Sequence, residues 1–188
     1  MLLHRRMVVA VGMCLAVATQ TVNAHEHREH GAHVHGIGQL NVVLDGSTLE
    51  IELDSPAMNL VGFEHAPRSK AEHEQRDIAI ARLREAGLLF VLPAPAACRL
   101  ESVEVAEEGA GHEGEAEHHH EHGDGAEQHH SDINAHYRFH CAEPARLDGI
   151  DVRLFELFPA THELEVQYIA PNGQGAAELT ADEHRLRF

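Results

Sequence analysis

The chain has 188 residues, with 14 Lys and Arg against 31 Asp and Glu, so its formal net charge is −17. This charge argues against nucleic acids and anionic membrane surfaces as partners, because both are bound through clustered positive charge. The 43% of hydrophobic residues is enough for a buried core, which excludes a wholly disordered protein, and the length fits one domain.

Residues 1–24 have the pattern of a secretory signal. A basic start at His4-Arg5-Arg6 precedes a short apolar stretch, and Val22-Asn23-Ala24 supplies the small residues of a cleavage site. The apolar stretch is too short to span a bilayer, so we expect export without membrane insertion after cleavage. A lipoprotein attached through Cys14 is the alternative, although Met13 is not the small residue expected before such a cysteine.

A histidine-rich arm, residues 25–36, follows the predicted cleavage site. In an extended segment the side chains of His33 and His35 point to the same side, roughly 7 Å apart, so both can reach one metal ion. Gly36 and Gly38 permit a turn that returns the arm to the sheet. A frayed terminus without a defined site is the alternative.

Residues 37–188 are predicted to form a single α+β domain with a mostly antiparallel sheet and one main helix. Alternating patterns predict strands over residues 39–44 and 48–53, joined by a hairpin turn at Asp45-Gly46-Ser47. A capping box predicts a helix from about Ser69 to Ala86, with Gly87 as its stop signal.

The later part of the domain has weaker patterns. Strands are predicted at residues 99–106, 135–141 and 163–169, and residues 152–158 fit either a helix or a strand. Pro171-Asn172-Gly173 predicts a turn before a last strand that ends at Phe188.

The strongest functional signal is an insert within the domain, residues 107–133. It holds nine acidic residues, seven of the 19 histidines and one large aliphatic residue, so it is predicted to be disordered for want of apolar surface. Imidazole nitrogens and carboxylate oxygens are ligands that Zn²⁺ accepts. An acidic linker with incidental histidines is the alternative. The predicted insert ligands are His112, His118, His119, His120, His122, His129 and His130.

Cys98 and Cys141 are the two cysteines that remain after the predicted cleavage. An even pair in an oxidising compartment predicts a disulfide, with two buried free thiols as the alternative. If the cysteines pair, no thiolate is left for zinc, and imidazole and carboxylate groups remain as the ligands.

Other histidines are weaker candidates. In Phe63-Glu64-His65, just before the predicted helix, either His65 or Glu64 could supply a third structured ligand. His136 and His140 share one face of their predicted strand but lie about 13 Å apart, so each needs ligand partners from elsewhere or is a plain surface histidine. Four further residues carry less signal: His73, Asp77, His162 and His184.

Two blocks of the sequence resemble the ZrgA-type proteins of bacterial periplasms. They are His33-Val34-His35-Gly36-Ile37-Gly38-Gln39-Leu40-Asn41-Val42 and Leu53-Asp54-Ser55-Pro56-Ala57-Met58-Asn59-Leu60-Val61-Gly62-Phe63-Glu64-His65. The resemblance implies a periplasmic zinc-binding protein, made under zinc limitation, that assists zinc acquisition beside an ABC-type importer. It also implies a metal-ligand role for His33, His35 and His65, and for the insert histidines as a class.

The sequence therefore predicts a protein that captures or buffers Zn²⁺ and hands it to an importer component, and not an enzyme. Nickel or copper handling is an alternative, because Cu²⁺ outcompetes Zn²⁺ at nitrogen sites. A zinc-dependent hydrolase, with Glu64 as general base beside His33, His35 and His65, is a weaker alternative. The sequence has no H-E-x-x-H pattern to support it.

Overall fold

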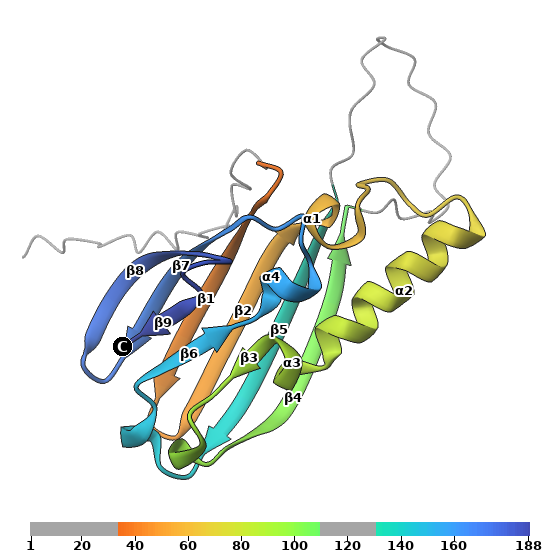
Figure 1. The fold of residues 1–188 in the computed structure, drawn as a ribbon. Coiled ribbons are helices and arrows are strands. Elements are labelled where there is room, and N and C mark those ends of the chain that lie inside the picture. Colours follow the sequence, from red (N-terminus) through yellow and green to blue (C-terminus); the bar gives the residue numbers. More distant parts are fainter. Residues whose placement is uncertain (1–33, 110–130) are drawn as a thin grey trace, which may run out of the picture. The chain divides into compact units, whose positions relative to one another are not determined.

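The computed structural model describes residues 34–109 and 131–188, which form a larger and a smaller β-sheet with short helices (Figure 1). The predicted signal, the arm through His33 and all seven insert histidines lie outside the described residues.

Six strands form the larger sheet, in the order β4-β5-β2-β1-β7-β8. Neighbouring strands are antiparallel except β1 and β7, which run parallel, so the predicted mostly antiparallel sheet is confirmed. The strands are β1 (Ile37–Asp45), β2 (Thr48–Pro56), β4 (Cys98–Glu108), β5 (Asp132–Cys141), β7 (Glu163–Ala170) and β8 (Gly173–Thr180).

A second layer packs on one face of the larger sheet and lies in front of it in Figure 1. Its three-stranded sheet has the order β3-β6-β9, from β3 (Phe90–Val91), β6 (Gly149–Val152) and β9 (Arg185–Arg187). The helices are α1 (Ala57–Val61), α2 (Lys70–Arg84), α3 (Ala86–Leu89) and α4 (Leu154–Leu157), and single 3-10 turns span Ala94–Ala96 and Pro144–Arg146. Of the described helices, none has the length and apolarity needed to cross a membrane.

The core lies between the two layers because apolar residues alternate along the larger sheet. On β2, Leu49, Ile51 and Leu53 are completely buried, whereas Glu50 and Glu52 on the opposite face are partly exposed. Burial of each such aliphatic side chain is worth about 1.5–3 kcal/mol. The other face of the larger sheet is therefore polar.

The first hairpin and the main helix are confirmed. Asp45 pairs with Thr48 across a two-residue loop whose Gly46 has φ +57°, a conformation that favours glycine. Helix α2 begins with the capping box, in which Ser69 accepts from the Glu72 N–H and the Glu72 carboxylate accepts from the Ser69 N–H.

The predicted end of the helix is wrong. Helix α2 ends at Arg84, and Gly87 lies inside the next helix, α3, instead of stopping the first. The chain turns at Glu85 because α3 then buries Ala86 and Leu89 against the core. Tertiary packing thus overrides the local glycine signal.

Three further segments differ from their predicted bounds. Residues 152–158 contain the end of β6 and helix α4, and the last predicted strand is two strands, β8 and β9. Both β4 and β5 continue into the predicted insert, because Glu107 and Glu108 pair with Ile133 and Asp132.

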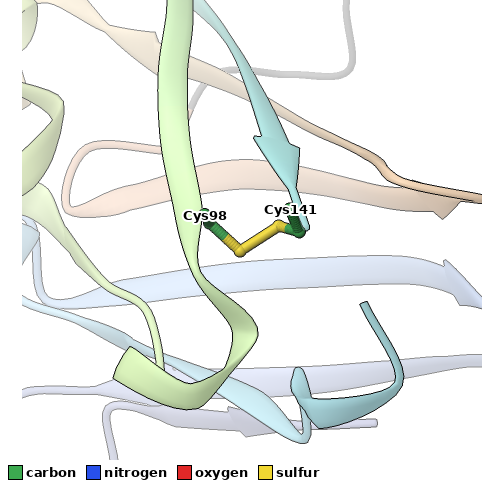
Figure 2. The surroundings of a disulfide bond; sticks show 2 residues. All are labelled: Cys98 and Cys141. Atoms are coloured by element: carbon green, nitrogen blue, oxygen red, sulfur yellow. A yellow bond between two sulfur atoms is a disulfide. The ribbon is translucent and has the colours of Figure 1, made fainter. Parts of the chain in front are cut away.

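The predicted disulfide between Cys98 and Cys141 is present (Figure 2). The two cysteines are opposite each other in the register of β4 and β5, with Cα atoms 3.8 Å apart. They join the start of β4 to the end of β5, at the opposite end of this strand pair from the predicted insert.

Candidate metal centre at one end of the larger sheet

Each of the six strands has one terminus at the same end of the larger sheet, at the top of Figure 1: β1, β5 and β7 begin there, and β2, β4 and β8 end there. The register fixes this arrangement, because Ile37 pairs with Glu163, and Asp132 pairs with both Pro56 and Glu108. We call the end bounded by these five residues the insert end, since residues 110–130 connect β4 to β5 there.

Three predicted ligand-bearing segments are rooted at the insert end. The N-terminal arm leads into β1, the segment with Glu64 and His65 follows β2 and α1, and the insert joins β4 to β5. These segments are far apart in the sequence, and the strand order brings their roots together.

His35 is the first described histidine at the insert end. Its Nε2 atom lies 2.8 Å from Oε1 of Glu64, and the two side chains are 53% and 14% exposed. A carboxylate oxygen accepts, so Nε2 carries the proton and Nδ1 is the nitrogen of a neutral ring that keeps its lone pair. Metal-ligating histidines typically bind the metal through one ring nitrogen while the other nitrogen donates to a carboxylate. His35 has this arrangement on its Nε2 side.

His65, the residue after Glu64, is exposed and fixed from two sides. Its Nδ1 atom donates to the carbonyl of Ala66 at 3.0 Å, and its ring stacks on Phe63 with centroids 5.2 Å apart. In the neutral ring Nε2 then keeps the lone pair that a metal ion requires. His35 and His65 therefore each present one nitrogen that is able to ligate.

His162 is at the same end, although no pattern in the sequence distinguishes it from other weak candidates. The carbonyl of Gly36 accepts from the N–H groups of His162 and Glu163, at 2.7 and 3.0 Å. The His162 ring lies so close that a Cβ atom on Gly36 would be 2.9 Å from its Nδ1. Only the parallel pairing of β1 with β7 places His162 beside the arm, and no local pattern in the sequence indicates that pairing.

Asn59 holds the root of the arm in place. This residue of α1 is 2% exposed, and its Oδ1 accepts from the Gly36 N–H at 2.7 Å. Its Nδ2 donates to the carbonyl of Ile37 at 2.9 Å and to Oγ of Ser55 at 3.2 Å. Gly36 has φ +89°, so the buried amide both satisfies the backbone and fixes the turn that precedes β1.

Replacing Asn59 by alanine is expected to lower the free energy of unfolding by about 2–4 kcal/mol. The buried N–H of Gly36 loses its partner at about 1–3 kcal/mol, and the partly buried carbonyl of Ile37 loses its partner at a smaller cost. Urea unfolding followed by circular dichroism measures the change. Asn41→Ala is the matched control, since Asn41 is exposed on β1. Equal midpoints for the two variants would contradict the role given to Asn59.

The residues on either side of the insert are also held in place, by hydrogen bonds and an ion pair. Ser131 donates through Oγ to the carbonyl of Glu64 at 2.8 Å, and its own carbonyl accepts from the Ala57 N–H at 2.8 Å. On β4, Glu107 forms a two-point ion pair with Arg76 of α2, at 2.6 and 2.9 Å, and this carboxylate raises the pKa of Arg76. The insert therefore leaves the fold next to the segment that carries Glu64 and His65.

The remaining candidates are separate. His73 and Asp77 are exposed on α2, and His136 and His140 lie on the polar face of the larger sheet, opposite the buried Tyr137. Across residues 34–109 and 131–188, no three His, Cys, Asp or Glu side chains are already grouped to hold a metal ion. The ligand set predicted from the sequence therefore stays a prediction.

Comparison with known proteins found a match to one protein family. A sequence model described as ZrgA family zinc uptake protein matches residues 32–188, a range that includes every described strand and the whole insert. Among curated proteins, no significant match to the chain was found.

Proposed function

The chain belongs to the ZrgA family of zinc uptake proteins, and from this premise we propose that it captures Zn²⁺ in the periplasm and passes it to a component of an ABC-type importer. The role in zinc uptake comes with the family. Capture by imidazole groups, the periplasmic location and the handover are our proposal, which assigns the chain binding and delivery and no catalysed reaction.

One observation supports the proposal above the others: the roots of three histidine-bearing segments meet at the insert end. His35, His65 and His162 are exposed there on ordered backbone. The segment of residues 110–130, which starts and finishes there, adds seven histidines. A few histidines on ordered backbone, beside many others, give a zinc ion an initial binding site and several further ligands with which it can exchange.

The ligand chemistry suits a carrier. The two cysteines of the described residues are joined to each other, so a closed thiolate site is not available among those residues. Imidazole and carboxylate ligands hold Zn²⁺ without thiolate, and we propose that sites built from them are weaker than a closed thiolate site. Weaker sites allow zinc to move on to a tighter receptor.

Zinc binding is expected to be lost as the pH falls from 7.5 to 5. Imidazole must be neutral to bind a metal ion, and the pKa of an unperturbed histidine is about 6.5. Protons therefore displace zinc below that pH. Equilibrium dialysis of the exported protein against ZnCl₂ at both pH values measures the bound zinc. Circular dichroism at pH 5 is the control for unfolding. Full retention of zinc by a folded protein at pH 5 would show that carboxylates dominate.

Handover is tested by mixing the zinc-loaded protein with the purified solute-binding component of a zinc importer. We expect zinc to reach that component faster than it reaches a small chelator of equal affinity, because direct transfer avoids free Zn²⁺. If zinc reaches the importer component and the chelator at equal rates, handover is contradicted and the protein would only buffer zinc. Loading with Ni²⁺ or Cu²⁺ instead shows whether the transfer is specific to zinc.

A further inference from the structure

The polar face of the larger sheet contains a cross-strand row of three ligand-type residues. His136 on β5 is directly opposite Glu52 on β2 and directly opposite Glu104 on β4. These three strands lie side by side in Figure 1. Residues that are opposite in an antiparallel sheet share a face, with Cβ atoms about 4.5–5.5 Å apart. The imidazole thus stands between two carboxylates, and the three side chains are partly or fully exposed.

The surroundings of this row are acidic. The cation nearest along β5, Arg138, forms an ion pair with Glu50 at 2.5 Å. On the other side of the row the same face carries Asp54, and beyond it Glu165 of β7 is directly opposite Glu178 of β8. Like charges opposite each other are destabilising in a sheet unless something offsets them. A surface of this charge concentrates cations from solution.

We propose that Glu104, His136 and Glu52 form a second divalent-cation site, separate from the insert end. One imidazole nitrogen and two carboxylate oxygens match the ligands of Zn²⁺, at about 2.0–2.2 Å, with water in the remaining position. The three side chains are not grouped around a point in the structure. Strand register already fixes their backbones, so closure requires rotation of the two glutamate side chains, and for Glu52 the exchange of its present interaction for the metal ion. The choice of zinc rests on the proposed function.

His140 provides an internal comparison. It lies on the same strand and the same face as His136, but it is opposite Thr48 on β2 and Arg99 on β4. A hydroxyl and a guanidinium do not supply carboxylate oxygens, and the guanidinium repels a cation. Of the two histidines, His136 alone has a carboxylate on each side.

The test is nuclear magnetic resonance of the histidine ring nitrogens in the exported chain during titration with ZnCl₂. We expect the His136 ring signals, assigned with His136→Gln, to shift with zinc while those of His140 stay unchanged. In a Glu52→Gln, Glu104→Gln double variant the His136 shift should be lost. It should persist when the seven insert histidines are replaced by glutamine. Circular dichroism checks that each variant is folded.

Three outcomes would overturn the inference: an unshifted His136, an equal shift of His140, or a His136 shift that survives removal of both carboxylates. Loss of the shift on replacing only the insert histidines would do the same, because the site would then depend on them. If the insert histidines shift and His136 does not, this inference fails and the proposed function stands. If no histidine responds to zinc, both fail.

Discussion

Replacing the seven histidines between residues 110 and 130 by glutamine is expected to remove most of the zinc that the protein binds while leaving the fold intact. Glutamine keeps the length of the segment and its six carboxylates, and it is uncharged, as imidazole is above its pKa. Only the metal-binding nitrogens disappear. Isothermal titration with ZnCl₂ near neutral pH measures the stoichiometry, and an unchanged number of bound ions would contradict the role given to the insert.

A deletion of residues 110–130 provides a second form of the same experiment. Because Glu108 pairs with Asp132, the deletion leaves Gly109 and Ser131 as a two-residue connection between β4 and β5. Gly109 has φ +81°, and Gly-Ser suits the two-residue turns that favour a positive φ at the first position. We therefore expect the shortened chain to fold and to bind the same small number of zinc ions as the glutamine variant.

Removing the disulfide by Cys98→Ala and Cys141→Ala is expected to have the largest effect on stability. The bond closes a loop of 43 residues, which the chain-entropy model values at about 4 kcal/mol. That is a large part of the roughly 5–15 kcal/mol by which native proteins are stable. The effect should concentrate on β4, because this strand is at the edge of the larger sheet and β5 is its one partner among the described strands.

Urea unfolding measures the loss of stability, and native-state hydrogen exchange locates it. We expect the amides of Glu104 and Ala106 on β4, which face β5 in the register, to exchange faster in the variant, with a smaller change at Val42 on the central strand β1. A reductant should bring the parent protein to the stability of the variant and leave the variant unchanged. A uniform acceleration over all strands would show that the disulfide does not act on the edge in particular.

Local patterns in the sequence were enough to predict much of the fold. Alternating side chains gave β1 and β2, the capping box gave the start of α2, and the even pair of cysteines gave the disulfide. The second sheet could not be predicted in this way. Strand β3 has two residues and β9 has three, which is too short for a period to be visible.

The candidate site was predictable in its residue types and not in its geometry. Histidine clusters and the block resemblance pointed to His35 and His65, but neither indicates that Glu64 accepts from His35 or that Ser131 is bonded to the Glu64 carbonyl. Those contacts follow from the strand order. The row of His136 between two glutamates likewise depends on register, which a single strand does not reveal.

The parallel pairing of β1 with β7 has a consequence for the order of folding. The β1–β2 hairpin is local and can form early, whereas β7 is far along the chain, and non-local pairings are slow to form. Gly36 and His162 therefore come into contact only when the polypeptide has nearly completed its folding. A molecule that has not yet paired these two strands would lack the arrangement of His35, His65 and His162 at the insert end, on which the proposed handover of zinc depends. Under the proposed function, delivery of zinc would therefore require that folding is complete.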